Sequence, residues 1–270
     1  MIRFSREQML ALENTSMHRF ISRVVDELPG YRGPVVAGRT RTTLFQAATT
    51  AVEHGQSFDL ESERALFLFS NIAVSLGAYF FTDPALPWAR DIVNDGSYLT
   101  NEMIDDLWNA YTEYCEFVMG PDADAIFPEP AYARFLALPP PPPPPDDGTF
   151  APVIADMAAL WPEKVSHLAP DALREHILGA GKRAAALGIK DHGARVWFCR
   201  IAFLIGQSFD ADPLHDWALP ALQNRQRWPD TDVASALRTS FIENVIQPAL
   251  AWQSEPETPE APDNDNNGDT

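Results

Sequence analysis

Residues 77–89 read GAYFFTDPALPWA, and residues 206–218 read GQSFDADPLHDWA. Six of these thirteen positions are identical at a constant offset of 129 residues. The identical pairs are Gly77/Gly206, Phe80/Phe209, Asp83/Asp212, Pro84/Pro213, Trp88/Trp217 and Ala89/Ala218. Chance could produce one Asp-Pro match, but not an ordered series of this length. The sequence therefore predicts two diverged tandem copies of one structural unit.

The similarity extends to both sides of the motif. An apolar segment precedes each copy, ALFLFSNIAVSL at 65–76 and ARVWFCRIAFLI at 194–205. Apolar residues recur with the three- and four-residue spacing of a helix, and the alternation typical of strands is missing. We therefore expect an all-α fold. The predicted helices are 5–28, 40–54, 60–80, 84–93, 101–119, 150–160, 170–187, 191–207, 213–224 and 231–251.

A run of seven prolines, Pro139–Pro145, divides the chain. Such a run favours an extended polyproline helix, which would act as a semi-rigid spacer or, less plausibly, as a docking site for a proline-reading domain. The tail is acidic and lacks large apolar residues, so we expect it to be disordered. The predicted organisation is a first helical unit at 1–138, a linker at 139–148, a second unit at 149–253 and the tail at 254–270.

The Asp-Pro pairs have a structural interpretation. Aspartate is a favourable N-cap and proline suits the first position of a helix. We therefore expect Asp83-Pro84 and Asp212-Pro213 each to begin a helix. Trp88 and Trp217 follow one turn later and should cover the core. The alternative is that the motif forms a shared ligand surface.

Composition narrows the possible functions. The chain is 46% hydrophobic, which is enough to form a core, and its net charge is −18. A strongly acidic surface repels nucleic acid and anionic membranes, so neither is an expected partner. The segment before the first predicted helix has no apolar stretch of the kind that marks a signal peptide, and we expect a cytoplasmic protein whose two cysteines, Cys115 and Cys199, are reduced.

The acidic charge is concentrated in the first unit. That unit contains ten arginines and nineteen acidic residues, whereas the second is nearly neutral. The predicted helix at 101–119 contributes many of the acids. This helix face is either a solvated surface or a docking site for a basic protein. The candidate partner-binding residues are Glu102, Asp105, Asp106, Trp108, Glu113, Tyr114 and Glu116.

No motif for catalysis, cofactor binding or metal binding is evident. The chain lacks a nucleophile elbow, a zinc-protease helix, a P-loop and a dinucleotide fingerprint. Asp210, Asp212, His215 and Asp216 could suggest a metal site, but the first copy has no equivalent cluster. We therefore expect no cofactor, no metal and no enzymatic activity. The alternative is an enzyme or toxin effector whose active site assembles only in space.

The order of a small-residue helix ending at glycine, an apolar helix and then F-x-x-D-P-x-x-x-W-A resembles a family of small helical proteins encoded in bacterial type VI secretion effector gene clusters. The second copy is the closer match. The first has Phe81 and Thr82 where acidic residues are more usual, and a glycine-rich insert, GYRGPVVAG. The resemblance covers both units but not the linker or tail, and it carries no catalytic residues.

The resemblance implies an accessory protein encoded with secreted toxins. We therefore expect a non-enzymatic, cytoplasmic binding protein that recognises a toxin, an effector or a component of the secretion spike. An immunity protein would bind its toxin and abolish the toxin's activity, whereas an adaptor or chaperone would bind without inhibiting. The sequence does not separate these roles.

Overall fold

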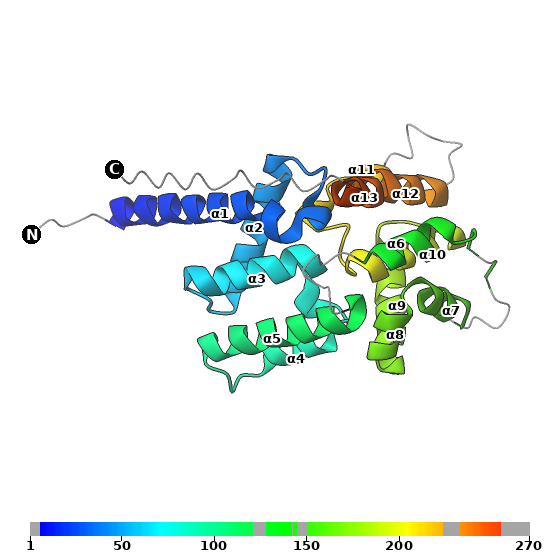
Figure 1. Ribbon diagram of the computed structural model, residues 1–270, viewed down its shortest axis with the longest axis horizontal. Coiled ribbons are helices and arrows are strands. Elements are labelled where there is room, and N and C mark those ends of the chain that lie inside the picture. The colour runs from blue at the N-terminus through cyan, green and yellow to red at the C-terminus, as the bar shows by residue number, and fades with distance from the viewer. Residues whose placement is uncertain (1–5, 121–127, 142, 145–150, 224–232, 255–270) are drawn as a thin grey trace, which may run out of the picture.

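The computed structural model describes residues 6–120, 128–141, 143–144, 151–223 and 233–254, and the described residues form helices without strands (Figure 1). The all-α prediction is confirmed. In the first half the helices are α1 (Arg6–Val36), α2 (Arg41–Ser57), α3 (Glu63–Leu76), α4 (Pro87–Asn94), α5 (Thr100–Met119) and α6 (Glu129–Ala137). In the second half they are α7 (Ala151–Leu160), α8 (Pro162–His167), α9 (Pro170–Ala186), α10 (His192–Ile205), α11 (Ala218–Gln223), α12 (Val233–Phe241) and α13 (Gln247–Ser254).

Short 3₁₀ and π turns complete the described structure. The 3₁₀ turns are η1 (Phe80–Thr82) and η3 (Pro213–His215), and the π turn η5 (Ile242–Ile246) joins α12 to α13. Helix α1 continues past Pro29, where the sequence predicted its end, and bends at Arg32, whose backbone is not helical. The second proline, Pro34, then lies in the first turn after the bend, where its missing N–H costs little.

Two pairs of helices have bounds related by the same offset as the motifs. Adding 129 to the bounds of α2 and α3 gives those of α9 and α10. Helices α3 and α10 both begin at a side-chain N-cap, because Ser62 accepts a hydrogen bond from Ala65 N (3.1 Å) and Asp191 accepts one from Ala194 N (2.7 Å). Each apolar helix therefore starts and stops at the position that the other copy predicts.

The two halves pack directly against each other. Helix α1 contacts α13, α2 contacts η3 and α5 contacts α8, and one hydrophobic core contains side chains from both halves. In Figure 1, α1 to α5, blue to cyan-green, lie beside the helices of the second half, with α1 adjacent to α13, whereas α6 lies among the helices of the second half, next to α10. The extensive packing between halves was not anticipated from the linker.

The start of the proline run is held against the second half. The buried guanidinium of Arg200 donates a hydrogen bond to the Pro139 carbonyl oxygen (3.0 Å) and forms an ion pair with Asp156 (2.7 Å). Arg238 donates to the Leu136 carbonyl oxygen (3.0 Å). These contacts fix the described beginning of the predicted spacer. Residues 145–148 and the predicted disordered tail from 255 onward lie outside the described residues.

Among the described residues, no helix combines the length and the apolar character needed to cross a bilayer. Both cysteines are buried and unpaired, Cys115 on α5 and Cys199 on α10. Burial raises the pKa of Cys199 to about 12, which keeps this thiol protonated and unreactive at neutral pH.

Candidate functional site

Helix α5 presents its acidic residues to solvent, as its periodicity predicts. Its apolar residues Met103, Ile104 and Leu107 face the core. In Figure 1, α5 lies with α4 along the lower edge of the first half. The exposed carboxylates of the predicted partner-binding face are Glu102, Asp105, Asp106, Glu113 and Glu116.

Some of these acids already have partners within the chain. Asp105 forms an ion pair with the exposed Arg64 of α3 (2.8 Å). The side chain of Glu102 accepts a hydrogen bond from the backbone N–H of Leu99 (3.3 Å), at the start of the helix. The pKa of Tyr98 is raised, first of all by its hydrogen bond to Asp106. The carboxylates of Glu113 and Glu116, toward the C-terminal end of α5, are therefore the ones more available to a partner.

The two aromatic anchors predicted for this face differ in exposure. Trp108 is half-buried and lies against the ring of Tyr111 (5.4 Å between ring centroids). Tyr114 is only 2% exposed, so its prediction as a surface anchor is wrong. Its ring packs between Trp88 of α4 and His167 of α8, because α8 of the second half covers this part of α5.

The sequence prediction missed an aromatic residue that does reach the surface. Phe117 lies on α5 one residue after Glu116, and 53% of it is exposed. Its ring lies 5.0 Å from the ring of His167, at the end of α8. An exposed aromatic ring beside acids was the signal that could have identified it. With Glu113 and Glu116 it forms the acidic–aromatic face, the name used below for these three residues.

The aspartates shared by the two motifs, Asp83 and Asp212, lie where the two halves meet, here called the seam. Each of them accepts a hydrogen bond from the backbone of the other half. Asp212 Oδ2 accepts a hydrogen bond from the backbone N–H of Ala78 (2.7 Å), and Asp83 Oδ2 accepts one from Gln207 N (2.9 Å). Ala78 and Gln207 are themselves 129 positions apart. The other carboxylate oxygens bind locally, to Ala85 N in the first motif and Leu214 N in the second (2.8 Å each). The contacts are therefore reciprocal.

Close approach of the two backbones explains the paired glycines. A Cβ atom at Gly206 would lie 2.8 Å from the Leu76 carbonyl oxygen, and one at Gly77 would lie 3.1 Å from that of Ile205. Gly77 and Gly206 also have positive φ angles, +99° and +106° respectively, which favour glycine. Any side chain at Gly206 would push the two halves apart.

Asp83 and Asp212 each cap a single turn, in which Leu86 N donates to the Asp83 carbonyl oxygen (2.9 Å) and His215 N to that of Asp212 (2.9 Å). The expected start of a longer helix at these aspartates is wrong in both motifs, since α4 begins at Pro87 and α11 at Ala218. Helix α4 begins at Pro87, and Leu86 just before it has φ −129° and ψ 58°. A residue that precedes proline is excluded sterically from the α region, so the helix cannot run continuously from Pro84. The second motif has Asp216 in place of Pro87, and there Pro213 begins the short 3₁₀ turn η3.

The two motif tryptophans pack against the core but are buried to different extents. Trp217 is buried and stacks on Phe209 at 5.9 Å, whereas Trp88 is half-buried against Tyr114 at 5.7 Å. Neither indole N–H has a hydrogen-bond partner among the described residues. These positions agree with the expected packing role of both side chains.

Asp83 lies against His176 and near Lys164, whereas Arg39 and His54 act electrostatically on Asp212 without forming an ion pair with it among the described residues. The ring Nδ1 of His176, on α9, lies 2.7 Å from Asp83 Oδ1, and Lys164 of α8 lies nearby. Burial by itself would raise the pKa of Asp83, but His176, Lys164 and the Ala85 amide outweigh burial and lower this pKa to about 2. In contrast, burial dominates at Asp212 and raises its pKa.

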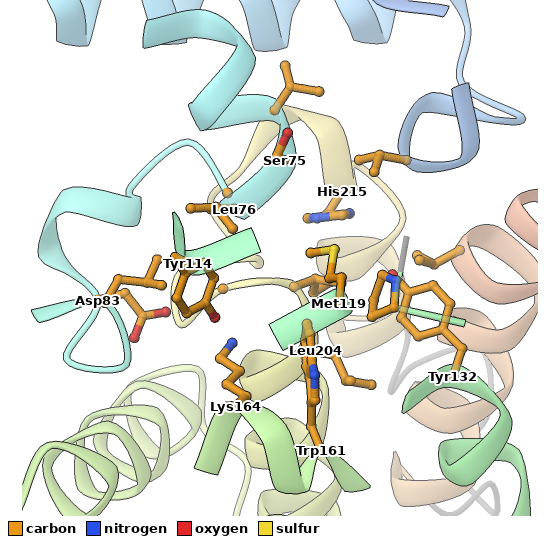
Figure 2. Close-up of a pocket in the computed structure, with 18 residues that line it drawn as sticks. Ser75, Leu76, Asp83, Tyr114, Met119, Tyr132, Trp161, Lys164, Leu204 and His215 are labelled. Carbon is orange, nitrogen blue, oxygen red and sulfur yellow. The ribbon is translucent and has the colours of Figure 1, made fainter. Parts of the chain in front are cut away.

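A cavity of about 40 Å³ lies at the seam, and Figure 2 shows its lining. Asp83 and Tyr114 reach it from the first half, and Lys164 and His215 from the second. Lys164 donates to the Phe203 carbonyl oxygen (2.6 Å), and burial lowers its pKa to about 8. The cavity is too small for an organic substrate, since ligand pockets usually exceed about 300 Å³.

The groups of the seam that resemble catalytic or metal-binding residues are buried or paired with other side chains. The Asp83–His176 contact resembles a carboxylate–imidazole pair, but the imidazole is completely buried and Nε2 has no partner among the described residues. The residues of the possible metal cluster have other partners: Asp210 forms an ion pair with Arg183, and Asp216 accepts a hydrogen bond from the Thr43 hydroxyl (2.9 Å). The part of the chain that the structure describes contains no group of three His, Cys, Asp or Glu side chains able to hold a metal.

Comparisons with known proteins identify no relative. No family model matches the chain, and neither the curated proteins nor the solved structures contain a match.

Proposed function

We propose that this chain is a non-enzymatic binding protein that docks a basic protein partner on α5. The observation that carries this proposal is the acidic–aromatic face, where Glu113 and Glu116 flank the 53% exposed ring of Phe117. An exposed aromatic side chain can supply a binding hot spot, and surrounding charges can steer and orient a partner. Trp108, half-buried on the same helix, lies nine residues before Phe117 and therefore on the opposite side of the helix, outside this face.

The distribution of charge supports this location. No lysine or arginine occurs between Asp91 and Asp124, whereas nine acidic residues do. Like charges on one helix face repel one another, by roughly a few tenths of a kcal/mol for each pair one turn apart. The resulting field would accelerate encounter with a basic surface, and Glu102, Asp105 and Asp106 would contribute to it.

We also propose that the two halves are diverged copies of one unit, joined through the polyproline segment. The reciprocal hydrogen bonds of Asp83 and Asp212 support this origin, as do the matching bounds of α2 with α9 and α3 with α10. Only the first copy carries the acidic–aromatic face. The second copy would then support the first through α8, which packs on α5.

The resemblance to proteins of type VI secretion effector clusters suggests the biological setting. In that setting the partner would be a toxin, an effector or a spike component, and binding would take place in the cytoplasm. An immunity protein and an adaptor differ in whether the bound toxin remains active. Measuring toxin activity in the presence of this chain would assign one role or the other.

The test is the rate of association with the partner obtained by co-purification from the native host. The variant is Glu113→Lys with Glu116→Lys, because reversal of Asp105 would also break its ion pair with Arg64 and would no longer test the carboxylates of the acidic–aromatic face alone. We expect association to slow by about tenfold or more at low salt, and the difference to shrink as salt screens the charges. Phe117→Ala should mainly accelerate dissociation.

The matched control is Glu53→Lys with Glu243→Lys, which changes the net charge equally at two exposed acids on α2 and η5. It should leave association nearly unchanged. Equal rates for both double variants and for the parent chain would show that the acidic–aromatic face is a solvated surface, and the proposal would then fail.

A further inference from the structure

Two buried polar groups at the seam cavity lack hydrogen-bond partners among the described residues, and a third, the Lys164 amino group, has N–H groups to spare. The Tyr114 hydroxyl and His215 Nδ1 have none, although their residues are only 2% and 5% exposed. Lys164, also 5% exposed, uses one of its three N–H groups on the Phe203 carbonyl oxygen. Buried polar groups are normally satisfied, since leaving them unpaired is costly. All three groups line the same cavity.

The size of the cavity limits what could satisfy them. Its volume of about 40 Å³ is enough for about three water molecules, since one requires roughly 10–15 Å³ by this measure. Figure 2 shows the Tyr114 hydroxyl directed toward the Lys164 amino group, yet the two form no hydrogen bond. A small molecule placed between them could accept from both.

The charges of the lining favour a neutral ligand. Lys164 and Asp83 bring opposite charges to the same cavity, and each stabilises the charged form of the other. A bound anion would add a charge near a carboxylate, at a high desolvation cost. The ligand must also suit His215 Nδ1, which can be a donor or an acceptor. Water donates and accepts, and it carries no charge.

We propose that the seam cavity is a binding site for ordered water. One such water accepts hydrogen bonds from Tyr114 on α5 and Lys164 on α8, and so joins the two halves. Ordered water of this kind contributes nearly as much enthalpy as a direct hydrogen bond. The proposed water site involves only residues that line the seam cavity, and it does not depend on the acidic–aromatic face.

The test is a high-resolution crystal structure of the full chain grown without halide, with a second crystal soaked in sodium bromide. We expect density for a water within about 2.7–3.2 Å of Lys164 Nζ and Tyr114 Oη, and no anomalous bromide peak there. An empty cavity would overturn the proposal. So would a bromide peak at this position, because it would identify an anion site.

A solution measurement tests the same site without a lattice. Magnetic relaxation dispersion of water nuclei counts long-lived internal waters, and Tyr114→Phe should remove at least one. The control is Tyr79→Phe, a half-buried tyrosine that does not line this cavity, and it should leave the count unchanged. An unchanged count in correctly folded Tyr114→Phe would contradict the proposed bridge.

Discussion

Asp83 and Asp212 occupy equivalent positions in the two motifs but bind different numbers of donors. Asp83 accepts hydrogen bonds from Ala85 N and Gln207 N and contacts His176 Nδ1, whereas Asp212 accepts from two backbone amides. The sequence alone predicted the same N-cap contribution, about 1 kcal/mol, at each position. The structure separates the two, because Asp83 contacts His176 directly, whereas Arg39 and His54 act on Asp212 only through longer-range electrostatics.

Replacing these aspartates should therefore have unequal effects on stability. Asp83→Ala leaves His176 and Lys164 without their counter-charge, so we expect a loss of about 3–5 kcal/mol. Asp212→Ala removes two hydrogen bonds to a carboxylate, and we expect about 1–3 kcal/mol. Urea unfolding followed by circular dichroism measures both. Equal losses near 1 kcal/mol would show that both residues are simple caps.

The pH dependence of stability should also distinguish the two residues. The pKa of Asp83 is lowered to about 2, so its stabilising contribution is complete above the unfolded value of about 3.8 and is lost as pH falls toward 2. The pKa of Asp212 is raised, so its protonation favours the folded state as pH falls. Unfolding of Asp83→Asn should become less sensitive to pH between 4 and 2 than unfolding of the parent. Identical slopes would contradict the assigned environment of Asp83.

At the scale of single elements, most helices could be predicted because each has a clear apolar stripe and a local start or stop signal. Helices α3 and α10 show this best, with a capping side chain at one end and a glycine of positive φ at the other. Helix α8 was missed because it has only six residues between Trp161 and Leu168. The start of α4 was predicted at Pro84, but the helix begins at Pro87, because the residue before a proline is disfavoured in the helical conformation.

The exposed acids of α5 could be predicted from periodicity, but the aromatic residues could not. Tyr114 and Phe117 lie one turn apart on α5, so both fall near the border of its apolar stripe. Which of them is covered depends on α8, whose sequence lies more than forty residues away and reaches Tyr114 through His167. Contacts of this range leave no local signal in the sequence.

At the scale of the whole molecule, the packing of the two halves at the seam could not be predicted from the sequence. The motif pointed to two similar units, and the proline run, interpreted as a semi-rigid spacer, did not indicate whether they pack together. Nothing local indicates that His176 on α9 reaches Asp83, or that Arg200 holds Pro139. Both contacts depend on the packing of one half against the other.

Because one core includes side chains from both halves, we expect the chain to unfold as a single cooperative unit. Native-state hydrogen exchange should give the same opening free energy for the slowest amides of α3 and α10. Far-UV circular dichroism and tryptophan fluorescence should report coincident urea transitions. A distinct, earlier opening of either helix would show that the halves fold independently.

The reciprocal contacts of Asp83 and Asp212 have the pattern of an isologous interface, in which residue i touches residue j and j touches i. If the duplication proposed above began with a symmetric homodimer whose subunits became fused, fusion would have lifted the constraint that every substitution occurs on both sides of the axis. His176 and Lys164 correspond to Ala47 and Val35 in the first half. The buried charges at Asp83 would then have arisen on one side after the fusion.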